Sequence, residues 1–302
     1  MSFLSGKIPR STTLPFVCAV AAGSLWGQPP ATDSFRSPEV LATVRIAGLT
    51  ESSGIVASRQ HAGVLWTHND SGGGPYLFAM NRSGELLGRW RVKSAKSSDW
   101  EDISIGPGAR SGWNLYVGDI GDNRRRRPFV TVYRVPEPQP EASANRQTAS
   151  AQALRFTYPD GAHDAECLMV HPVSGDLYIV TKAQLGDSET RVYRASPPRK
   201  PGTRPVKLQL VAKLTLPERG FFARLFGITG GDISPDGSRV VLCDYFGAVE
   251  APFDPNWKME WSVVDLGPRE QGEAICYRED GKALLATTEG KEFPLIEVRR
   301  RD

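Results

Sequence analysis

One short segment occurs five times along the chain, and it limits the possible folds more than any other feature of the sequence. Each copy places small or acidic residues directly before an aliphatic residue: "ESSGI" ends at Ile55, "DWEDI" at Ile103, "DAECL" at Leu168, "TGGDI" at Ile233 and "QGEAI" at Ile275. A second apolar run follows each copy, and turns such as "HPVSGD", "SPDGSR" and "YREDGK" carry the Pro, Asp and Gly that hairpins use. A two-part pattern that recurs in this way indicates a repeat architecture.

The segments between the copies predict further strands. An apolar run precedes each copy, as in "ALRFTYP" and "EWSVVDLG", and helical periodicity is nearly absent. Each unit therefore has about four strands, which is typical of a propeller blade. We predict an all-β chain that forms a single five-bladed β-propeller, with six blades as the alternative if the insertions "PEPQPEASANRQTAS", "SPPRKPGTRP" and "PERGFFARLFGIT" hide another.

The apolar segment "EVLATVRIAG" precedes the first copy and has no blade of its own. The residues after Ile275 are too few to complete a blade comfortably. We therefore expect this N-terminal strand to pair into the last blade, which closes the ring and leaves no long exposed edge.

The first residues have the layout of an export signal. Lys7 and Arg10 precede the uncharged stretch "STTLPFVCAVAAGSLWG", which is too short and too interrupted for a comfortable membrane span. We predict a signal peptide over residues 1–27, a linker over 28–37 and the propeller over 38–302. The mature protein is then secreted or periplasmic and has no membrane span.

The cysteines and the charge exclude several classes of protein. Without the signal segment three cysteines remain, Cys167, Cys243 and Cys276, all in apolar runs and without a C-x-x-C pair, so we expect buried thiols. A net charge of +3, with one dense basic run at 124–127, argues against a nucleic-acid partner. Motifs for triad hydrolysis, nucleoside triphosphate motors and dinucleotide redox chemistry are missing. We expect a monomer.

Acidic residues gather where the repeat predicts one face of the propeller. The start of the first strand and the end of the second strand of every blade lie on the same face. The residues at the starts are Glu51, Asp99, Glu101, Asp102, Asp164, Glu166, Asp232 and Glu273. The residues at the ends are Asn69, Asp70, Asp119, Asp122, Asn123, Lys182, Asp244 and Glu289. Carboxylates crowded at one axis cannot all stay ionised without a compensating charge.

A bound cation is one solution, and oxygen ligands of this kind suit calcium. Zinc is less suitable, because only His68 and His163 lie near this face. We predict calcium as the cofactor, held by Glu51, Asp99, Glu101, Asp164, Glu166, Asp232 and Glu273. The alternative is structural: the acids make turns or hold neighbouring blades together. Asp236 and Asp280 belong to turns on either interpretation.

The segments "ESSGI", "LWTHNDSG", "DWEDI", "LYVGDIGDN", "DAECL", "GDLYIVTK" and "QGEAI" resemble a group of secreted bacterial β-propeller proteins of uncharacterised function. The resemblance covers nearly the whole chain after the signal. In plan the chain is also remotely similar to calcium-dependent apyrase-type nucleotidases and to β-propeller phytases. That similarity implies Glu51, Glu101, Glu166 and Glu273 as oxygens on the metal side. The fourth copy departs from it, because Gly231 stands in the acidic column and the carboxylate moves to Asp232.

Three functions remain open. The first is a calcium-binding module for ligand recognition or scaffolding, with a small anionic ligand or a protein as its partner. The second is a calcium-dependent phosphoric-ester or nucleotide hydrolase. Its catalytic candidates are Asp119, which accepts a proton, Asp122 beside it, and Arg124 or Arg125, which balance phosphate charge. The third is a glycoside-processing enzyme with carboxylates from different blades around a sugar.

The segment "PERGFFARLFGIT" is expected over the same face of the propeller. Its apolar residues Phe221, Phe222, Leu225 and Phe226 form either a lid over a substrate or a plug in the mouth of the channel. Arg219 and Arg224 are expected exposed beside them.

Overall fold

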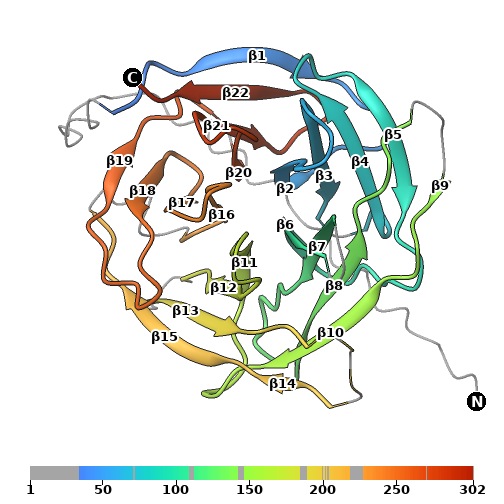
Figure 1. Cartoon of the computed structure of the whole chain (residues 1–302), viewed down its shortest axis with the longest axis vertical. Helices are drawn as coiled ribbons and strands as arrows, with labels where there is room; N and C mark the ends of the chain where they lie inside the picture. Colours follow the sequence, from blue (N-terminus) through green and yellow to red (C-terminus); the bar gives the residue numbers. More distant parts are fainter. Residues whose placement is uncertain are drawn as a thin grey trace, which may run out of the picture.

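Five sheets surround a central axis in the computed structural model of the chain, and the four main strands of each are antiparallel (Figure 1). The structure describes residues 34–301 except 71, 109–111, 142–145, 184–188, 199, 201, 203, 218–226 and 270. Within these residues every regular element is a strand, and the sheets form a five-bladed β-propeller. This confirms the predicted fold class and blade number. The predicted signal peptide and linker fall almost wholly on residues 1–33, which lie outside the described part, as does the segment 218–226.

The blades are numbered by their inner strands. The inner strands are β2 (Ser52–Ala57), β6 (Trp100–Pro107), β11 (Ala165–Val170), β16 (Gly230–Ile233) and β20 (Gly272–Tyr277). The second strands are β3 (Val64–Asn69), β7 (Trp113–Asp119), β12 (Leu177–Thr181), β17 (Arg239–Cys243) and β21 (Ala283–Thr288). The third strands are β4 (Tyr76–Asn81), β8 (Val130–Pro136), β13 (Thr190–Ala195), β18 (Ala248–Pro252) and β22 (Phe293–Arg299). The fourth strands are β5 (Leu86–Arg91), β10 (Gln152–Thr157), β15 (Gln209–Leu214), β19 (Ser262–Val264) and β1 (Glu39–Val44).

The N-terminal strand closes the ring, as predicted. β1 pairs antiparallel with β22 at the outer edge of blade 5, with Val44 opposite Phe293. An isolated bridge between Phe35 and Arg300 extends this pairing. The first and last parts of the chain therefore share one sheet, and the two ends of the described chain lie close together at this blade (Figure 1).

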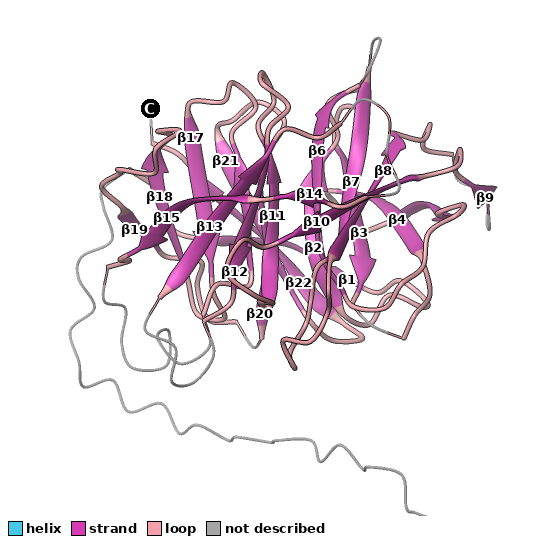
Figure 2. Ribbon diagram, turned by 90° about the horizontal axis from the view of Figure 1, so that it is seen from below, coloured by secondary structure: helices cyan, strands magenta, loops and turns pink. Residues whose placement is uncertain are grey.

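Two insertions reach back to the preceding blade. β9 (Arg146–Gln147) comes from the Pro-rich insertion of blade 2 and pairs in parallel with β5 of blade 1. β14 (Val206–Lys207) follows the insertion of blade 3 and pairs in parallel with β10 of blade 2. Each insertion thus covers part of an outer edge that would otherwise expose unpaired backbone groups. Figure 1 shows β9 beside β5, and the side view in Figure 2 shows β14 beside β10.

The space between blades is filled by aromatic and aliphatic side chains. Trp66 and Trp100 are fully buried, and the Trp66 ring meets Trp90 edge-on with ring centroids 5.1 Å apart. Cys167, Cys243 and Cys276 are free and buried, as expected. In the part of the chain that the structure describes, no helix has the length and hydropathy needed to cross a membrane.

Two buried aspartates tie neighbouring blades together. In blade 2, Oδ1 of Asp102 accepts a hydrogen bond from the amide of Ile103, and Oδ2 accepts one from Leu168 of blade 3, 2.9 Å away. Asp232 repeats this arrangement from blade 4, with Oδ2 accepting from Tyr277 of blade 5 at 2.9 Å. In blades 2 and 4, the acid before the aligned isoleucine is therefore a clamp between blades.

The closure predicts a difference between two valines of β1. Val44 is fully buried in a core cluster that blades 5 and 1 share, whereas Val40 is 61% exposed. We expect Val44→Ala to lower the free energy of unfolding by about 2 kcal/mol, because it removes two buried carbons and leaves a cavity. Val40→Ala should change it by less than about 0.5 kcal/mol. Urea denaturation measures both, and equal small effects would contradict a closed ring.

Candidate functional site

The inner strands of four blades begin with an irregularity of the same kind. Their pairing with the second strand shifts by one residue between Ser52 and Gly54, Trp100 and Asp102, Ala165 and Cys167, and Gly272 and Ala274. A β-bulge of this type changes the direction of the side chain it carries. The residues skipped by the shift are Ser53, Glu101, Glu166 and Glu273. β16 pairs without a shift and has Gly231 at the aligned place.

The bulges give three glutamates equivalent positions in blades 2, 3 and 5. Glu51 does not share this position, because it lies two residues earlier and Ser53 takes the place in blade 1. Glu51 instead forms an isolated bridge with Glu289 at the end of β21. The register therefore differs from the set of four glutamates that the distant similarity implies.

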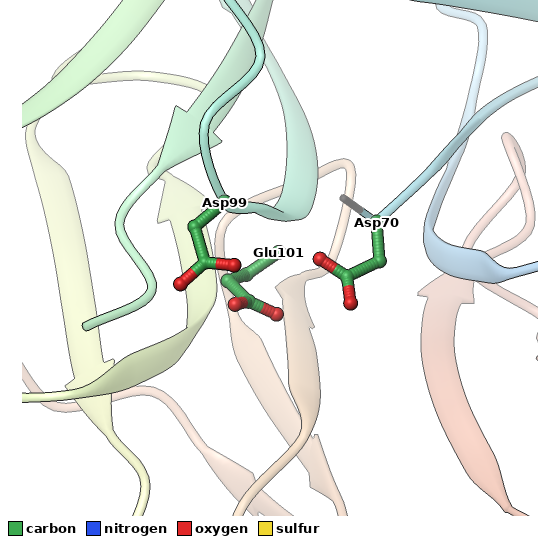
Figure 3. Close-up of side chains that lie close together, drawn as sticks. All are labelled: Asp70, Asp99 and Glu101. Carbon is green, nitrogen blue, oxygen red and sulfur yellow. The ribbon is translucent and has the colours of Figure 1, made fainter. Parts of the chain in front are cut away.

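Three carboxylates from blades 1 and 2 converge on one point. Asp70 follows β3, Asp99 precedes β6, and Glu101 lies in the bulge of β6; one oxygen of each lies within 4.8 Å of the others. Figure 3 shows the three carboxylates facing one another. Glu101 is only 6% exposed, whereas Asp70 and Asp99 are partly exposed. We call Asp70, Asp99 and Glu101 the acidic triad.

The loop "GDIGDN" presses its backbone against the acidic triad. A Cβ atom on Gly121 would overlap Oε1 of Glu101 and lie 2.6 Å from Oδ2 of Asp99. The amide of Gly121 also donates to the carbonyl of Asp99. A residue without a side chain is therefore required where the loop meets the two carboxylates.

The two aspartates of this loop are engaged in holding it. Oδ1 of Asp119 lies 2.7 Å from a guanidinium nitrogen of Arg127, and its oxygens accept hydrogen bonds from the amides of Ser98 and Asp99 at 3.3 Å. Oδ2 of Asp122 accepts from the amide of Arg127 at 2.7 Å. The amide of Asp122 donates to Oδ1 of Asp164 at 2.8 Å, which connects blade 2 to blade 3.

The arginines of the basic run separate into two groups. Arg127 returns to the loop, where it pairs with Asp119 and donates to the carbonyl of Gly121 at 2.7 Å. Arg124 is exposed and Arg125 is partly buried with a left-handed backbone conformation, φ 51°. Arg127 thus contacts the site loop through its side chain, whereas the backbone amide of Arg125 donates to the carbonyl of Asp122 at 2.7 Å. The sequence predicted a role at the site for Arg124 and Arg125, but not for Arg127.

A lysine supplies positive charge to the other half of the face. Nζ of Lys182, after β12, lies 2.5 Å from Oε1 of Glu166 and 3.3 Å from the hydroxyl of Tyr245. Burial disfavours this ammonium, but Glu166, Tyr245 and Glu273 outweigh burial and raise its pKa. Lys182 thus supplies a positive charge, fixed by its contacts with Glu166 and Tyr245, to the part of the face formed by blades 3 to 5.

Burial and mutual repulsion shift the acids toward their neutral forms. Burial, then Glu166 and Asp70, raise the pKa of Glu101 well above its usual value. Burial and Asp164 raise the pKa of Asp99. Glu166 also has a raised pKa, since burial outweighs the opposing effect of Lys182. The face therefore holds more carboxylates than its own cations stabilise in the ionised state.

The remaining predicted residues have identifiable surroundings. Asp232 is buried, its oxygens accept hydrogen bonds from two backbone amides, and Oδ2 lies 3.9 Å from a guanidinium nitrogen of Arg59. Burial and Glu166 raise the pKa of Glu273, and they outweigh the opposing charge of Lys182.

The histidines near this face are engaged elsewhere. Nδ1 of the buried His68 lies 2.8 Å from the carbonyl oxygen of Asn69, and His163 pairs with Asp160 at 3.1 Å. Neither His68 nor His163 belongs to the acidic triad, whose three members all offer carboxylate oxygens.

Two features of the site were not assigned from the sequence. Asp70 was placed on the correct face but left out of the predicted metal ligands, because it follows a second strand and not the repeated segment. Lys182 was placed on the face without a role. Both residues lie directly after a second strand, and this position is the sequence signal that could have identified them. The residues that they approach, Glu101 for Asp70 and Glu166 for Lys182, lie at the starts of inner strands.

Comparisons with known proteins add little to this geometry. No protein-family model matches the chain, and the search of curated proteins finds no match. One similar solved structure is that of a Thermus thermophilus protein assigned as an oxidoreductase (glucose dehydrogenase). It is 12% identical with a TM-score of 0.47, and the match covers 87% of this chain and 99% of that chain. A likeness of this size carries no argument about chemistry, and the blade assignment rests on the strand pairing.

Gly121 offers a steric test of the site. We expect Gly121→Ala to push Asp99 and Glu101 apart and to lower the free energy of unfolding by about 1–3 kcal/mol, as overpacking does. Gly202→Ala is the matched control, because the nearest atom that its Cβ would meet among the described residues is 4.0 Å away. Thermal denaturation of both variants checks this, and an unchanged Gly121→Ala protein would show that the loop does not press on the carboxylates.

The buried acids predict a stability that falls as pH rises. Burial raises the pKa of Asp232 from 3.8 to about 6, against the opposing charge of Arg59. Because the folded protein holds this proton at higher pH than the unfolded chain, its contribution is complete below pH 3.8 and is lost as pH rises through about 6. Glu101 and Glu166 act in the same direction.

We therefore expect the melting temperature in the presence of a chelator to fall between about pH 5.5 and about pH 8. Differential scanning calorimetry measures it. A melting temperature that rises across this range would mean that the acids are ionised and compensated in the folded protein.

Proposed function

We propose that the chain binds a divalent cation, calcium, at the acidic triad, and that the cation-loaded face acts as a ligand-recognition module. The observation that carries the proposal is the convergence of Asp70, Asp99 and Glu101 on one point. The three residues come from two different blades, so the propeller ring itself assembles the site.

The spacing and chemistry of the acidic triad fit calcium. Calcium takes oxygen ligands at about 2.3–2.6 Å, so two oxygens on opposite sides of one ion lie about 5 Å apart. The oxygens of the acidic triad lie within 4.8 Å of one another, which is inside that span. Carboxylates are hard ligands, and neither histidine nor cysteine belongs to the acidic triad, which disfavours zinc.

The distribution of charge explains why the cation would come from solution. The ammonium group of Lys182 neutralises the charge of Glu166 and opposes the rise in the pKa of Glu273. The acids of blades 3 to 5 are therefore compensated by a positive side chain of the protein. Arg127 is paired with Asp119 and turned toward the loop. Among the described residues no ion pair reaches Asp99 or Glu101. Burial, and then repulsion by neighbouring acids, raise the pKa of these two acids, and a bound calcium would relieve the repulsion.

The surroundings of Asp119 favour recognition over hydrolysis. A proton-accepting carboxylate needs an oxygen available to the reacting group. Asp119 already accepts two backbone hydrogen bonds and pairs with Arg127, and Asp122 accepts a hydrogen bond from the amide of the same arginine. Both aspartates thus support the site loop.

The expected affinity suits a secreted or periplasmic protein. Extracellular calcium modules work at dissociation constants of about 10⁻⁴–10⁻³ M, weaker than those of intracellular sensors. Export of the chain, as the first 27 residues predict, would place the site where calcium reaches such concentrations.

Calorimetric titration of the mature protein with calcium chloride tests the proposal. We expect one binding event with a dissociation constant near about 10⁻³ M or tighter. Asp99→Asn should weaken it by about tenfold or more, because a charged ligand is lost. Glu85→Gln is the control: it removes the same charge from an exposed residue in the turn between β4 and β5, at the opposite end of the propeller. If millimolar calcium gives neither heat nor a thermal shift, the proposal is wrong.

A further inference from the structure

One carboxylate oxygen on the face that carries the acidic triad, Glu166 and Glu273 has no hydrogen-bond partner among the described residues. Oε1 of Glu166 is bound by Lys182, but Oε2 is buried and accepts no hydrogen bond. Glu166 is only 7% exposed, so most of its surface is removed from bulk water. When Glu166 is ionised, as its ion pair with Lys182 favours, a buried acceptor without a hydrogen bond is unfavourable, and it calls for a donor from outside the chain.

Glu166 is bound by the lysine and lies in the blade next to that of Glu101. Glu166 and Glu101 take the same bulge position on the inner strands β11 and β6, which contact each other. A ligand that reaches Oε2 of Glu166 therefore lies on the same face of the propeller as the proposed cation.

The position of this acceptor limits the ligand chemistry. A carboxylate or a fully ionised phosphate would coordinate the cation but has no hydrogen to donate to Glu166, and it would face Glu101 and Glu273. A hydroxyl group can do both tasks, because its oxygen lone pairs coordinate a cation while its hydrogen is donated to a carboxylate. Two adjacent hydroxyls on one carbon frame would chelate the ion and supply the donor.

An aromatic ring stands at the rim of the same half of the face. Tyr245, whose hydroxyl contacts Lys182, and Phe246 follow β17 in the turn to β18; their ring centroids are 6.4 Å apart. The turn is fixed by Asp244, whose Oδ1 accepts hydrogen bonds from the amides of Phe246 and Gly247. Phe246 is 48% exposed. The exposed part of its ring is a flat apolar surface that can pack on the C–H face of a sugar ring.

We propose that the acidic face binds a neutral polyol of the carbohydrate class. A vicinal diol coordinates the cation of the acidic triad and donates a hydrogen bond to Oε2 of Glu166, while Phe246 packs against the ring. The proposal rests on the cation site proposed above. It differs from the small anionic ligand expected from the sequence, because the partnerless group in the site is an acceptor.

Saturation-transfer NMR on the mature protein tests this inference. The probes are methyl α-D-mannopyranoside, methyl β-D-galactopyranoside and myo-inositol, each of which carries a cis vicinal diol. With calcium present we expect saturation transfer to at least one of them, and we expect it to disappear when the metal is removed by a chelator. Mannose 6-phosphate is the anionic comparison.

Phe246→Ala is the informative variant, because it leaves all carboxylates in place. We expect it to weaken glycoside binding about tenfold, as truncation of an aromatic anchor does, with calcium binding unchanged by calorimetry. Val173→Ala is the control: Val173 is 74% exposed in the turn between β11 and β12, at the opposite end of the propeller. It should bind glycoside as the parent protein does.

The outcomes separate the two proposals. If the protein does not bind calcium, the cation site itself fails. If calcium binds but none of the three neutral probes does, or if binding is confined to mannose 6-phosphate, the cation site stands and the polyol inference is overturned. Unchanged glycoside binding by Phe246→Ala would also overturn it.

Discussion

The burial of several carboxylates on one face, where they also repel one another, is the constraint that the rest of this structure depends on. The ring brings the starts of five inner strands to one axis. An acidic residue that recurs in the repeated segment therefore occurs several times near that axis. The chain answers this repulsion in several ways. The carboxylates of Asp102 and Asp232 accept hydrogen bonds from backbone amides of their own blade and of the next blade. Glu166 forms an ion pair with Lys182, and Asp119 forms one with Arg127. Within the acidic triad, Asp99 and Glu101 have no such ion pair among the described residues.

The division of labour among the acids follows from their register. The acid directly before the aligned isoleucine, as in Asp102, is part of the regular ladder and is buried between blades. The acid one place earlier lies in a bulge, which frees it from the ladder. A single-residue difference in position therefore separates an acid that holds blades together from one that is presented to the face. The structural interpretation of the repeat holds for the first kind of acid, and the proposed cation site draws on the second.

The repeat predicted the fold because it records strand pairing directly. Five copies, hairpin turns and an orphan N-terminal strand were enough to give five blades and the closure through β1. The site was predicted less completely, since its groups come from loops that the repeat does not align. Asp70 meets Asp99 only through packing of blade 1 on blade 2, and the place of Arg127 depends on how one loop folds back. Such contacts depend on three-dimensional placement that linear spacing does not encode.

The backward-reaching strands β9 and β14 have a consequence for the order in which the propeller is completed. The outer strand of blade 1 obtains its last pairing partner from residues 146–147, which belong to the insertion of blade 2. In the same way, the outer strand of blade 2 pairs with residues 206–207 of blade 3. Blade 5 in turn needs β1 from the beginning of the chain. Each early blade is thus left with an unfinished edge until the next part of the chain emerges, so the molecule is finished as a linked series and not as five independent sheets.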